Sequence, residues 1–303
     1  MSAAGNYLYG GLVFRSSVPL PLMPHSCELG SVDVDVTFGP VPTPAAECLR
    51  AKPHFAMYAD GTAILRSPHG IRLLIDNGRT LRIEVPEGVD ARLVQSWLIG
   101  PGLGLIMHQR GVPPLHACAV SRAGRALAIA GDSGAGKSTT ARALMEHGYD
   151  LLAEDQAIID PASATLFPGV PDLRLWAVAA QRFGERTEEY ARVGVHEDKF
   201  TISSSRDRFD RSPRPLAALF LLTSEPAEIP VSTRLRAGPA AHALHKHIYR
   251  QRLATFMGRG AEMFGWATAL AARVPVYAVR RPHDLSRLDE LAAHIEEVVE
   301  QLP

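Results

Sequence analysis

Cysteine is scarce in this chain of 303 residues. Its three cysteines, Cys27, Cys48 and Cys118, are odd in number, and their spacing fits neither a zinc site nor a disulfide framework. We interpret them as reduced thiols, the form expected in a cytoplasm. The fold must therefore be held by apolar packing, and at 46% apolar residues the chain can bury a sizeable core.

Long apolar runs and an excess of charge of one sign are also missing. The most apolar window, Leu216 to Thr223, is too short to cross a bilayer and predicts a buried strand. The first residues, MSAAGNYLYGGLVF, lack the basic start and the apolar stretch of a signal peptide. Lysine plus arginine number 32, as do aspartate plus glutamate, which argues against a general nucleic-acid binder. We expect a cytoplasmic protein that has neither a membrane nor a nucleic acid as partner.

Residues 1–88 have the composition and patterning of β-strands. From Val32 to Gly39 apolar and polar residues alternate, as in a half-buried strand. Two later segments predict hairpins, with turns at Asp60-Gly61 and Asn77-Gly78. We therefore predict a small, mostly antiparallel, β-rich N-terminal domain over residues 1–88.

Residues 89–303 show a different pattern. Apolar residues recur at helical spacing from Asp90 to Gly111, where Pro101 predicts a kink or a break. Two strands are expected around residues 122–124, then a loop, a helix from Lys137 and a strand that ends at Asp155. This βαβ order predicts an α/β domain with a mixed or parallel sheet.

Two further segments of this domain carry structural predictions. Residues 185–214 are charged and polar, and we interpret them as a mobile loop or lid. Residues 284–302 predict a final amphipathic helix, because its leucine, isoleucine and valine residues fall on one face.

The segment from Gly131 to Ser138 matches the phosphate-binding pattern G-x-x-x-x-G-K-[ST] in full. Glycines let backbone N–H groups approach phosphate oxygens, and the helix that follows directs its first N–H groups at the same charge. Lys137 supplies a cation between the β- and γ-phosphates, and Ser138 supplies an oxygen ligand for Mg²⁺. The candidate nucleotide-binding residues are Gly131, Asp132, Ser133, Gly134, Ala135, Gly136, Lys137, Ser138 and Thr139.

Two acids and a histidine flank this motif in the sequence. Glu154 and Asp155 end a strand that we expect beside the strand leading into the loop, and ligands bind at the carboxyl ends of such strands. One acid then faces Mg²⁺, and the other orients an attacking hydroxyl or accepts its proton. His116 precedes the adjoining strand and is a further catalytic candidate.

Several other side chains carry weaker signals. Lys199 can reach a phosphate from the predicted lid, although an ordinary surface lysine explains it equally well. Arg174 and Trp176 are candidates for lining the nucleotide or acceptor site, against the commoner alternative of a buried tryptophan. His242, His245 and His247 lack the spacing of a metal site, and we interpret them as part of a solvated basic helix.

The run from Leu115 to Ile159 resembles the catalytic core of HPr kinase/phosphorylase, a family of P-loop kinases. The likeness lies in LHACAV, GDSGAGKS and LLAED, with intervals similar to those of the family. It implies that His116 lies near the transferred phosphate, that Lys137 and Ser138 hold ATP and Mg²⁺, and that Glu154 takes the place of the family's activating aspartate. The metal candidates are Ser138 and Asp155. Because glutamate replaces that aspartate, the sequence leaves open which acid is the base.

The whole chain is similar to stand-alone HPr-kinase-like proteins, through YGGLVFRSSVPLPLMP, LRLW and EDKFTI. Some of these phosphorylate a serine of a lasso peptide precursor. The resemblance implies an ATP- and Mg²⁺-dependent kinase acting on a serine of a peptide or protein. The alternatives are a non-catalytic ATP-binding regulatory module and a kinase for a small-molecule hydroxyl. The sequence leaves open the acceptor, the nucleotide preference, reversibility and the oligomeric state, including a homo-oligomer.

Overall fold

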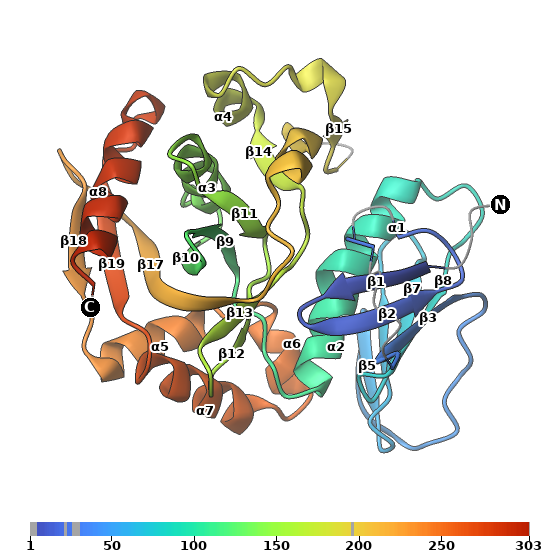
Figure 1. Ribbon diagram of the computed structural model, residues 1–303. Coiled ribbons are helices and arrows are strands. Elements are labelled where there is room, and N and C mark those ends of the chain that lie inside the picture. Colours follow the sequence, from blue (N-terminus) through green and yellow to red (C-terminus); the bar gives the residue numbers. More distant parts are fainter. Residues whose placement is uncertain (1–4, 21–22, 26–30, 195–196, 303) are drawn as a thin grey trace. The chain divides into compact units, whose positions relative to one another are not determined.

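The computed structural model describes residues 5–20, 23–25, 31–194 and 197–302 of a mixed α/β protein (Figure 1). Cys27 lies outside the described residues. The chain divides into two compact units, one formed by residues 1–113 and 250–262 and the other by residues 114–249 and 263–303. No helix in the described ranges has the length and apolar character needed to span a membrane.

The first unit contains an eight-stranded sheet in the order β1-β2-β3-β8-β7-β6-β5-β4. The sheet is antiparallel except that β3 runs parallel to β2 and β8. Both predicted hairpins are confirmed: β5 pairs with β6, and β7 pairs with β8 across Asn77-Gly78, where both residues have positive φ. The strands are β1 (Gly5–Tyr9), β2 (Leu12–Ser16), β3 (Val34–Phe38), β4 (Cys48–Lys52), β5 (Phe55–Tyr58), β6 (Ala63–Arg66), β7 (Arg72–Asp76) and β8 (Thr80–Glu84).

The helical segment after this sheet packs on it. It consists of α1 (Ala91–Trp97), a π-helical turn η1 (Leu98–Gly102) and α2 (Leu103–Gln109). Pro101 lies inside the π-turn, because its missing N–H favours an irregular turn at the expected kink. A Cβ on Gly102 would lie 3.4 Å from the Leu73 side chain. This close packing joins residues 89–113 to the first unit, so the division of the chain by contacts falls beyond residue 88. The unit also includes α6 (Gln251–Phe256).

A mixed sheet forms the centre of the second unit, with strands in the order β11-β9-β10-β17-β19-β18. β10 is parallel to β17, and β17 is parallel to β19. The strands β12 and β13 extend the sheet at the start of β17. These elements are β9 (Ala117–Arg122), β10 (Arg125–Gly131), β11 (Asp150–Ala153), β12 (Ile158–Asp160), β13 (Thr165–Phe167), β17 (Arg214–Pro226), β18 (Val231–Arg234) and β19 (Val276–Arg281).

The helices of this unit cover both faces of its central sheet. Leu127 and Ile129 of β10 and Phe220 of β17 belong to one apolar cluster with α3 and α8. Figure 1 shows α5 and α7 on the other side of these strands from α3. The predicted buried strand at residues 216–223 and the predicted final helix are confirmed by β17 and α8. The helices are α3 (Lys137–Glu146), α5 (Ala237–Lys246), α7 (Gly260–Ala271), η4 (Leu285–Arg287) and α8 (Leu288–Glu300).

The expected position of the strand ending in the acids was wrong. β11 does not pair with β10, because β9 forms a tight hairpin with β10 and occupies that edge. β11 is antiparallel to β9, and β9 is antiparallel to β10, so β11 and β10 still run in the same direction. Their carboxyl ends therefore lie at the same edge of the sheet.

The predicted loop at residues 185–214 was also wrong over most of its described length. β16 (Lys199–Ile202) pairs with β14 (Leu173–Trp176) and with β15 (Ala191–Arg192) in a three-stranded antiparallel sheet. Arg206 forms a bidentate pair with the buried Asp172, which ties the segment after β16 to the base of β14. Polar composition here reflects paired charges on a segment with secondary structure of its own. The remaining elements are α4 (Ala177–Arg182), η2 (Thr187–Glu189) and η3 (Ser203–Arg208).

Candidate nucleotide and acceptor site

The loop between β10 and α3 has the geometry of an anion-binding turn. Gly131, Gly134 and Gly136 all have positive φ, and α3 begins at Lys137 directly after the left-handed Gly136. A Cβ on Gly131 would lie 2.7 Å from the backbone oxygen of Leu222, so only glycine fits there. The first turn of α3 carries no acidic side chain. Its N–H groups and the helix dipole therefore favour a negatively charged ligand.

Lys137 is buried at the start of α3, and its Nζ donates hydrogen bonds to the carbonyl oxygens of Gly131 and Asp132, at 3.0 and 3.2 Å. Burial lowers the pKa of this ammonium, and the charges of Asp155 and Glu154 oppose the shift. The lysine is thus anchored to its own loop. Of the other loop residues, Ser133 and Gly134 are exposed, and Thr139 is half-buried.

Glu154 lies just past β11 and points its carboxylate at the phosphate-binding motif. Ser138 Oγ donates to Glu154 Oε1 at 2.9 Å, and the Cys118 thiol lies 2.9 Å from Oε2. The backbone N–H of Arg174 also donates to Oε1, at 3.3 Å. Glu154 is 4% exposed, and burial raises the pKa of its carboxyl, although the charge of Lys199 acts in the opposite direction.

None of these partners brings a positive charge into direct contact with Glu154. In the described part of the chain no ion pair includes this carboxylate, so its desolvation is offset by hydrogen bonds from neutral groups and by the more distant charges of Lys199 and Arg174. Serine and carboxylate oxygens are the hard donors that Mg²⁺ prefers. The pair formed by Ser138 and Glu154 therefore fits a divalent cation held beside the loop.

Asp155 has different partners although it is the next residue. His116 Nδ1 lies 3.1 Å from Asp155 Oδ1 and 3.1 Å from the Asp155 backbone oxygen. Both oxygens accept, so Nδ1 carries the proton and donates. Arg174 Nη1 lies 3.6 Å from Asp155 Oδ2. Burial acts to raise the pKa of Asp155, but the hydrogen bond and charge of His116, with Arg174 and Lys199, outweigh it and hold that pKa below its usual range.

The backbone explains how two neighbouring acids reach different partners. Asp155 has φ of 65°, in the left-handed region that costs a non-glycine residue conformational energy. This left-handed backbone conformation directs the two consecutive carboxylates apart. Arg174 braces both acids, its N–H on Glu154 and its guanidinium on Asp155.

Lys199 lies on β16, opposite Trp176 of β14. The charge of its ammonium influences Lys137, Glu154 and Asp155, so it lies within electrostatic range of all three. This position is compatible with contact between Lys199 and a phosphate, which stays a prediction. Trp176 is 49% exposed, which contradicts the expectation of a buried tryptophan.

The structure brings two more residues to the loop: Lys246, which sequence reasoning passed over, and His247, which it assigned to a solvated helix. Lys246 Nζ lies 3.3 Å from Asp132 Oδ1 of the loop, and His247 Nδ1 lies 3.9 Å from the same oxygen. The backbone carbonyl of His247 accepts from the backbone N–H of His116. His247 is therefore not part of a solvated face: its side chain is 12% exposed, and burial lowers its pKa to about 4.

Arg281 also reaches the loop, from the end of β19. Its Nη2 donates to the Ala135 carbonyl oxygen at 2.6 Å, and burial lowers its pKa. The Nε of Arg281 is buried and, among the described residues, has no hydrogen-bond partner. Its position at the carboxyl end of a parallel strand is the signal that could have identified it from sequence.

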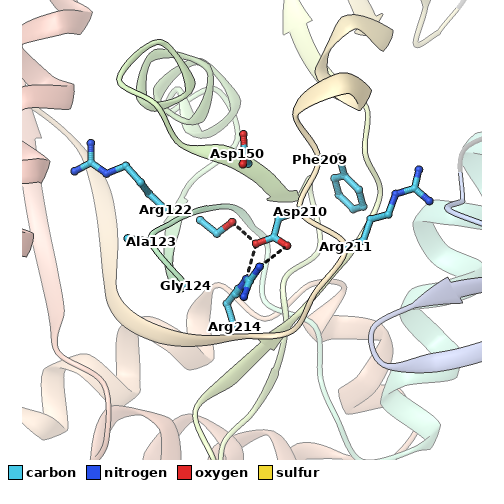
Figure 2. A pocket seen from close by; sticks show the side chains of 9 residues that line it. Arg122, Ala123, Gly124, Asp150, Phe209, Asp210, Arg211 and Arg214 are labelled. Carbon is cyan, nitrogen blue, oxygen red and sulfur yellow. Dashed lines mark hydrogen bonds and ion pairs between the residues drawn. The ribbon is translucent and has the colours of Figure 1, made fainter.

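A polar pocket lies at the opposite end of β10, around the β9–β10 turn (Figure 2). Asp210 accepts from the Ser121 hydroxyl at 2.6 Å and pairs with Arg214 through both carboxylate oxygens. The phosphate-binding motif follows the other end of β10, so we place this pocket outside the candidate site. Its lining residues are Ser121, Arg122, Ala123, Gly124, Asp150, Phe209, Asp210, Arg211 and Arg214.

Comparisons with known proteins give limited information on this chain. No family model matches it, and no curated protein matches it. Among solved structures, the HPr(Ser) kinase/phosphatase from Coxiella burnetii matches over 62% of this chain and 98% of its own, with 13% sequence identity and a TM-score of 0.32. At that identity and TM-score the likeness carries no argument about activity or substrate. The structure itself shows a mixed α/β fold.

Proposed function

We propose that this protein is an ATP- and Mg²⁺-dependent kinase with a P-loop core, which transfers the γ-phosphate to a serine hydroxyl of a peptide or protein. The observation that carries the proposal is the separation of two adjacent acids: Glu154 bonds to Ser138, whereas Asp155 bonds to His116. A protein that only binds a nucleotide has use for the first arrangement but not for the second.

In this proposal, Ser138 and Glu154 hold Mg²⁺, which when bound neutralises charge on the phosphates. Lys137 and the loop N–H groups bind the phosphate oxygens, and Lys199 adds positive charge on the acceptor side. The assignment of Glu154 to the metal differs from the family resemblance, which gave it the role of the activating aspartate. The contact with Ser138 supports the new assignment.

Asp155 then orients the acceptor hydroxyl. As the seryl oxygen bonds to the γ-phosphorus, the bond between that phosphorus and the β–γ bridging oxygen breaks, and the hydroxyl proton passes to Asp155. The lowered pKa of Asp155 makes it a weak base. Its main contribution is therefore alignment of the hydroxyl, with proton transfer late in the reaction. His116 and Arg174 fix the carboxylate in position.

A short peptide is the acceptor we favour, and a lasso peptide precursor is the specific candidate. This finer step is supported by the likeness of YGGLVFRSSVPLPLMP, LRLW and EDKFTI to the stand-alone HPr-kinase-like proteins. A homo-oligomer and a cytoplasmic location remain compatible with it.

The test is incubation of the protein and Mg·ATP with a library of serine-centred peptides, with candidate precursor peptides, and with free serine and sugars, followed by mass spectrometry. We expect one added phosphate on peptides and none on their Ser→Ala counterparts. Asp155→Asn should reduce kcat about 1,000-fold while Mg·ATP still binds, because the base acts on the acceptor. Glu154→Gln should instead weaken Mg²⁺-dependent nucleotide binding.

The alternatives give different results in the same experiment. Phosphorylation of free serine or a sugar, with no peptide modified, identifies a small-molecule kinase. Nucleotide binding without transfer to any of these acceptors supports the regulatory module. Equal rates for wild type and both acid variants would show that neither acid takes part.

A further inference from the structure

We propose that Trp176 is the docking platform for the acceptor chain, so that the proposed kinase selects an acidic peptide with an aromatic or apolar residue about three positions from the phosphorylated serine. This inference rests on the proposed function and adds the chemistry of the substrate to it.

The small sheet of β14 and β16 has one apolar face and one polar face. Leu173, Leu175 and Phe200 are buried in the core. Side chains alternate along a strand, and directly paired residues share a face. Arg174 and Trp176, with Lys199 opposite Trp176, therefore lie together on the other face.

This face adjoins the side of the site where the acceptor must lie. Arg174 contacts Asp155, the acid that we assign to the acceptor hydroxyl. In an in-line transfer the acceptor and the leaving nucleotide lie on opposite sides of the phosphorus. Residues that extend from the base therefore flank the acceptor rather than the nucleoside. Arg281, at the end of β19, contacts the loop at Ala135 instead.

The chemistry of the face indicates what it binds. Trp176 is 49% exposed, and an exposed indole ring offers a flat surface for an aromatic, proline or aliphatic side chain. Arg174 is 14% exposed and already paired with Asp155, whereas Lys199 places a further positive charge on the same face, which complements a carboxylate on the bound chain. We therefore commit to an extended, acidic peptide as the occupant.

Strand geometry sets the position of the selected residue. Trp176 is two residues beyond Arg174 on β14, which corresponds to about 7 Å along the strand. An extended peptide covers that distance and the 3.6 Å width of the Asp155–Arg174 contact in about three residues, at about 3.3 Å each.

The experiment is a positional scan of serine-centred peptides with wild type, Trp176→Ala and Trp176→Phe, and with Val178→Ala as the matched control. Val178 is also exposed, at 66%, and lies two residues further along the chain. We expect Trp176→Ala to raise the peptide KM about tenfold and to remove the aromatic or apolar preference. The kcat and the Mg·ATP Kd should change less than twofold, Trp176→Phe should restore most of the selectivity, and Val178→Ala should behave as wild type.

A second measurement separates the acceptor from the nucleoside. The Trp176 contribution to fluorescence, taken as the difference between wild type and Trp176→Phe, should be shielded from acrylamide by a selected peptide and not by Mg·ADP. Shielding by Mg·ADP alone, or unchanged selectivity in Trp176→Ala, overturns the inference while leaving the proposed kinase intact. If wild type phosphorylates no peptide, the proposed function fails, and this inference fails with it.

Discussion

Buried or half-buried carboxylates from other segments lie near both ends of β10, but their surroundings differ. Near the amino end, Asp210 is paired with Arg214 through two hydrogen bonds, and the hydrogen bonds from Arg214 and Ser121 hold its pKa below the usual value against the effect of burial. Beyond the carboxyl end, Glu154 is surrounded by neutral donors, and burial raises its pKa. The first carboxylate stabilises the fold, whereas the second is held in an environment unfavourable to its charge.

Under the proposed function, this difference separates structural charge from functional charge within one sheet. An aspartate with a bidentate arginine needs no further ligand to explain it. A desolvated glutamate directed at the serine of a phosphate-binding motif is the arrangement that the proposed Mg²⁺ site requires. In the pocket of Figure 2, the carboxylate of Asp210 is paired with the guanidinium of Arg214. In the candidate site, the carboxylate of Glu154 accepts hydrogen bonds from neutral groups.

The largest expected effect is at the phosphate-binding loop. Lys137→Ala should weaken Mg·ATP binding at least about 100-fold, because it removes the cation that contacts the phosphates. The thermal unfolding temperature should change little, since the ammonium bonds only to its own loop. Isothermal titration calorimetry measures the affinity. Wild-type affinity in the variant would rule out the loop as the nucleotide site.

A substitution near the amino end of β10 should instead lower the stability of the fold and leave nucleotide binding unchanged. Asp210→Ala removes the partner of Arg214 and of Ser121, so the free energy of unfolding should fall by about 3 kcal/mol. The Mg·ATP affinity should remain that of wild type. Urea denaturation and calorimetry check the two values, and Ser121→Ala is the milder control, at about 1 kcal/mol. A loss of nucleotide affinity in Asp210→Ala would contradict the separation of the two ends.

His247 should make stability depend on pH. Its folded pKa of about 4 lies below the unfolded value of 6.5, so the unfolded state binds the proton more readily. The stability it contributes is complete above pH 6.5 and is lost as the pH falls towards 4. Allowing for solvent screening, the loss is about 2 kcal/mol. Urea denaturation at several pH values should show this slope reduced in His247→Gln; an identical slope in both proteins would contradict it.

The smallest expected effect completes the comparison between Glu154 and Asp210. Glu154→Gln removes a charge whose folded pKa is raised, so the variant should be as stable as wild type or more stable, by about 1 kcal/mol, at neutral pH. The gain should disappear as the pH falls below the pKa of Glu154, because the wild-type carboxyl is then protonated as well. Denaturation without Mg²⁺ measures it. A clear loss of stability would show that Glu154 is a structural residue like Asp210.

Much of the local structure was accessible from sequence. The hairpins at Asp60-Gly61 and Asn77-Gly78, the helix from Lys137 and the buried strand at residues 216–223 depend on nearest neighbours along the chain, so turn residues and periodicity were sufficient. The segment 185–214 was misjudged because its charges are paired with residues such as Asp172, which is distant in sequence.

The sequence by itself determined the phosphate-binding motif and the presence of two acids and a histidine. Only the tertiary structure decided that β9 lies between β10 and β11, that Glu154 bonds to Ser138, and that Asp155 bonds to His116 and Arg174. It likewise exposed Trp176 and brought Arg281 and His247 to the loop. The physical reason is that consecutive carboxylates have the same chemistry until a left-handed residue turns one away from the other, and their partners come from strands that are adjacent only in the folded sheet.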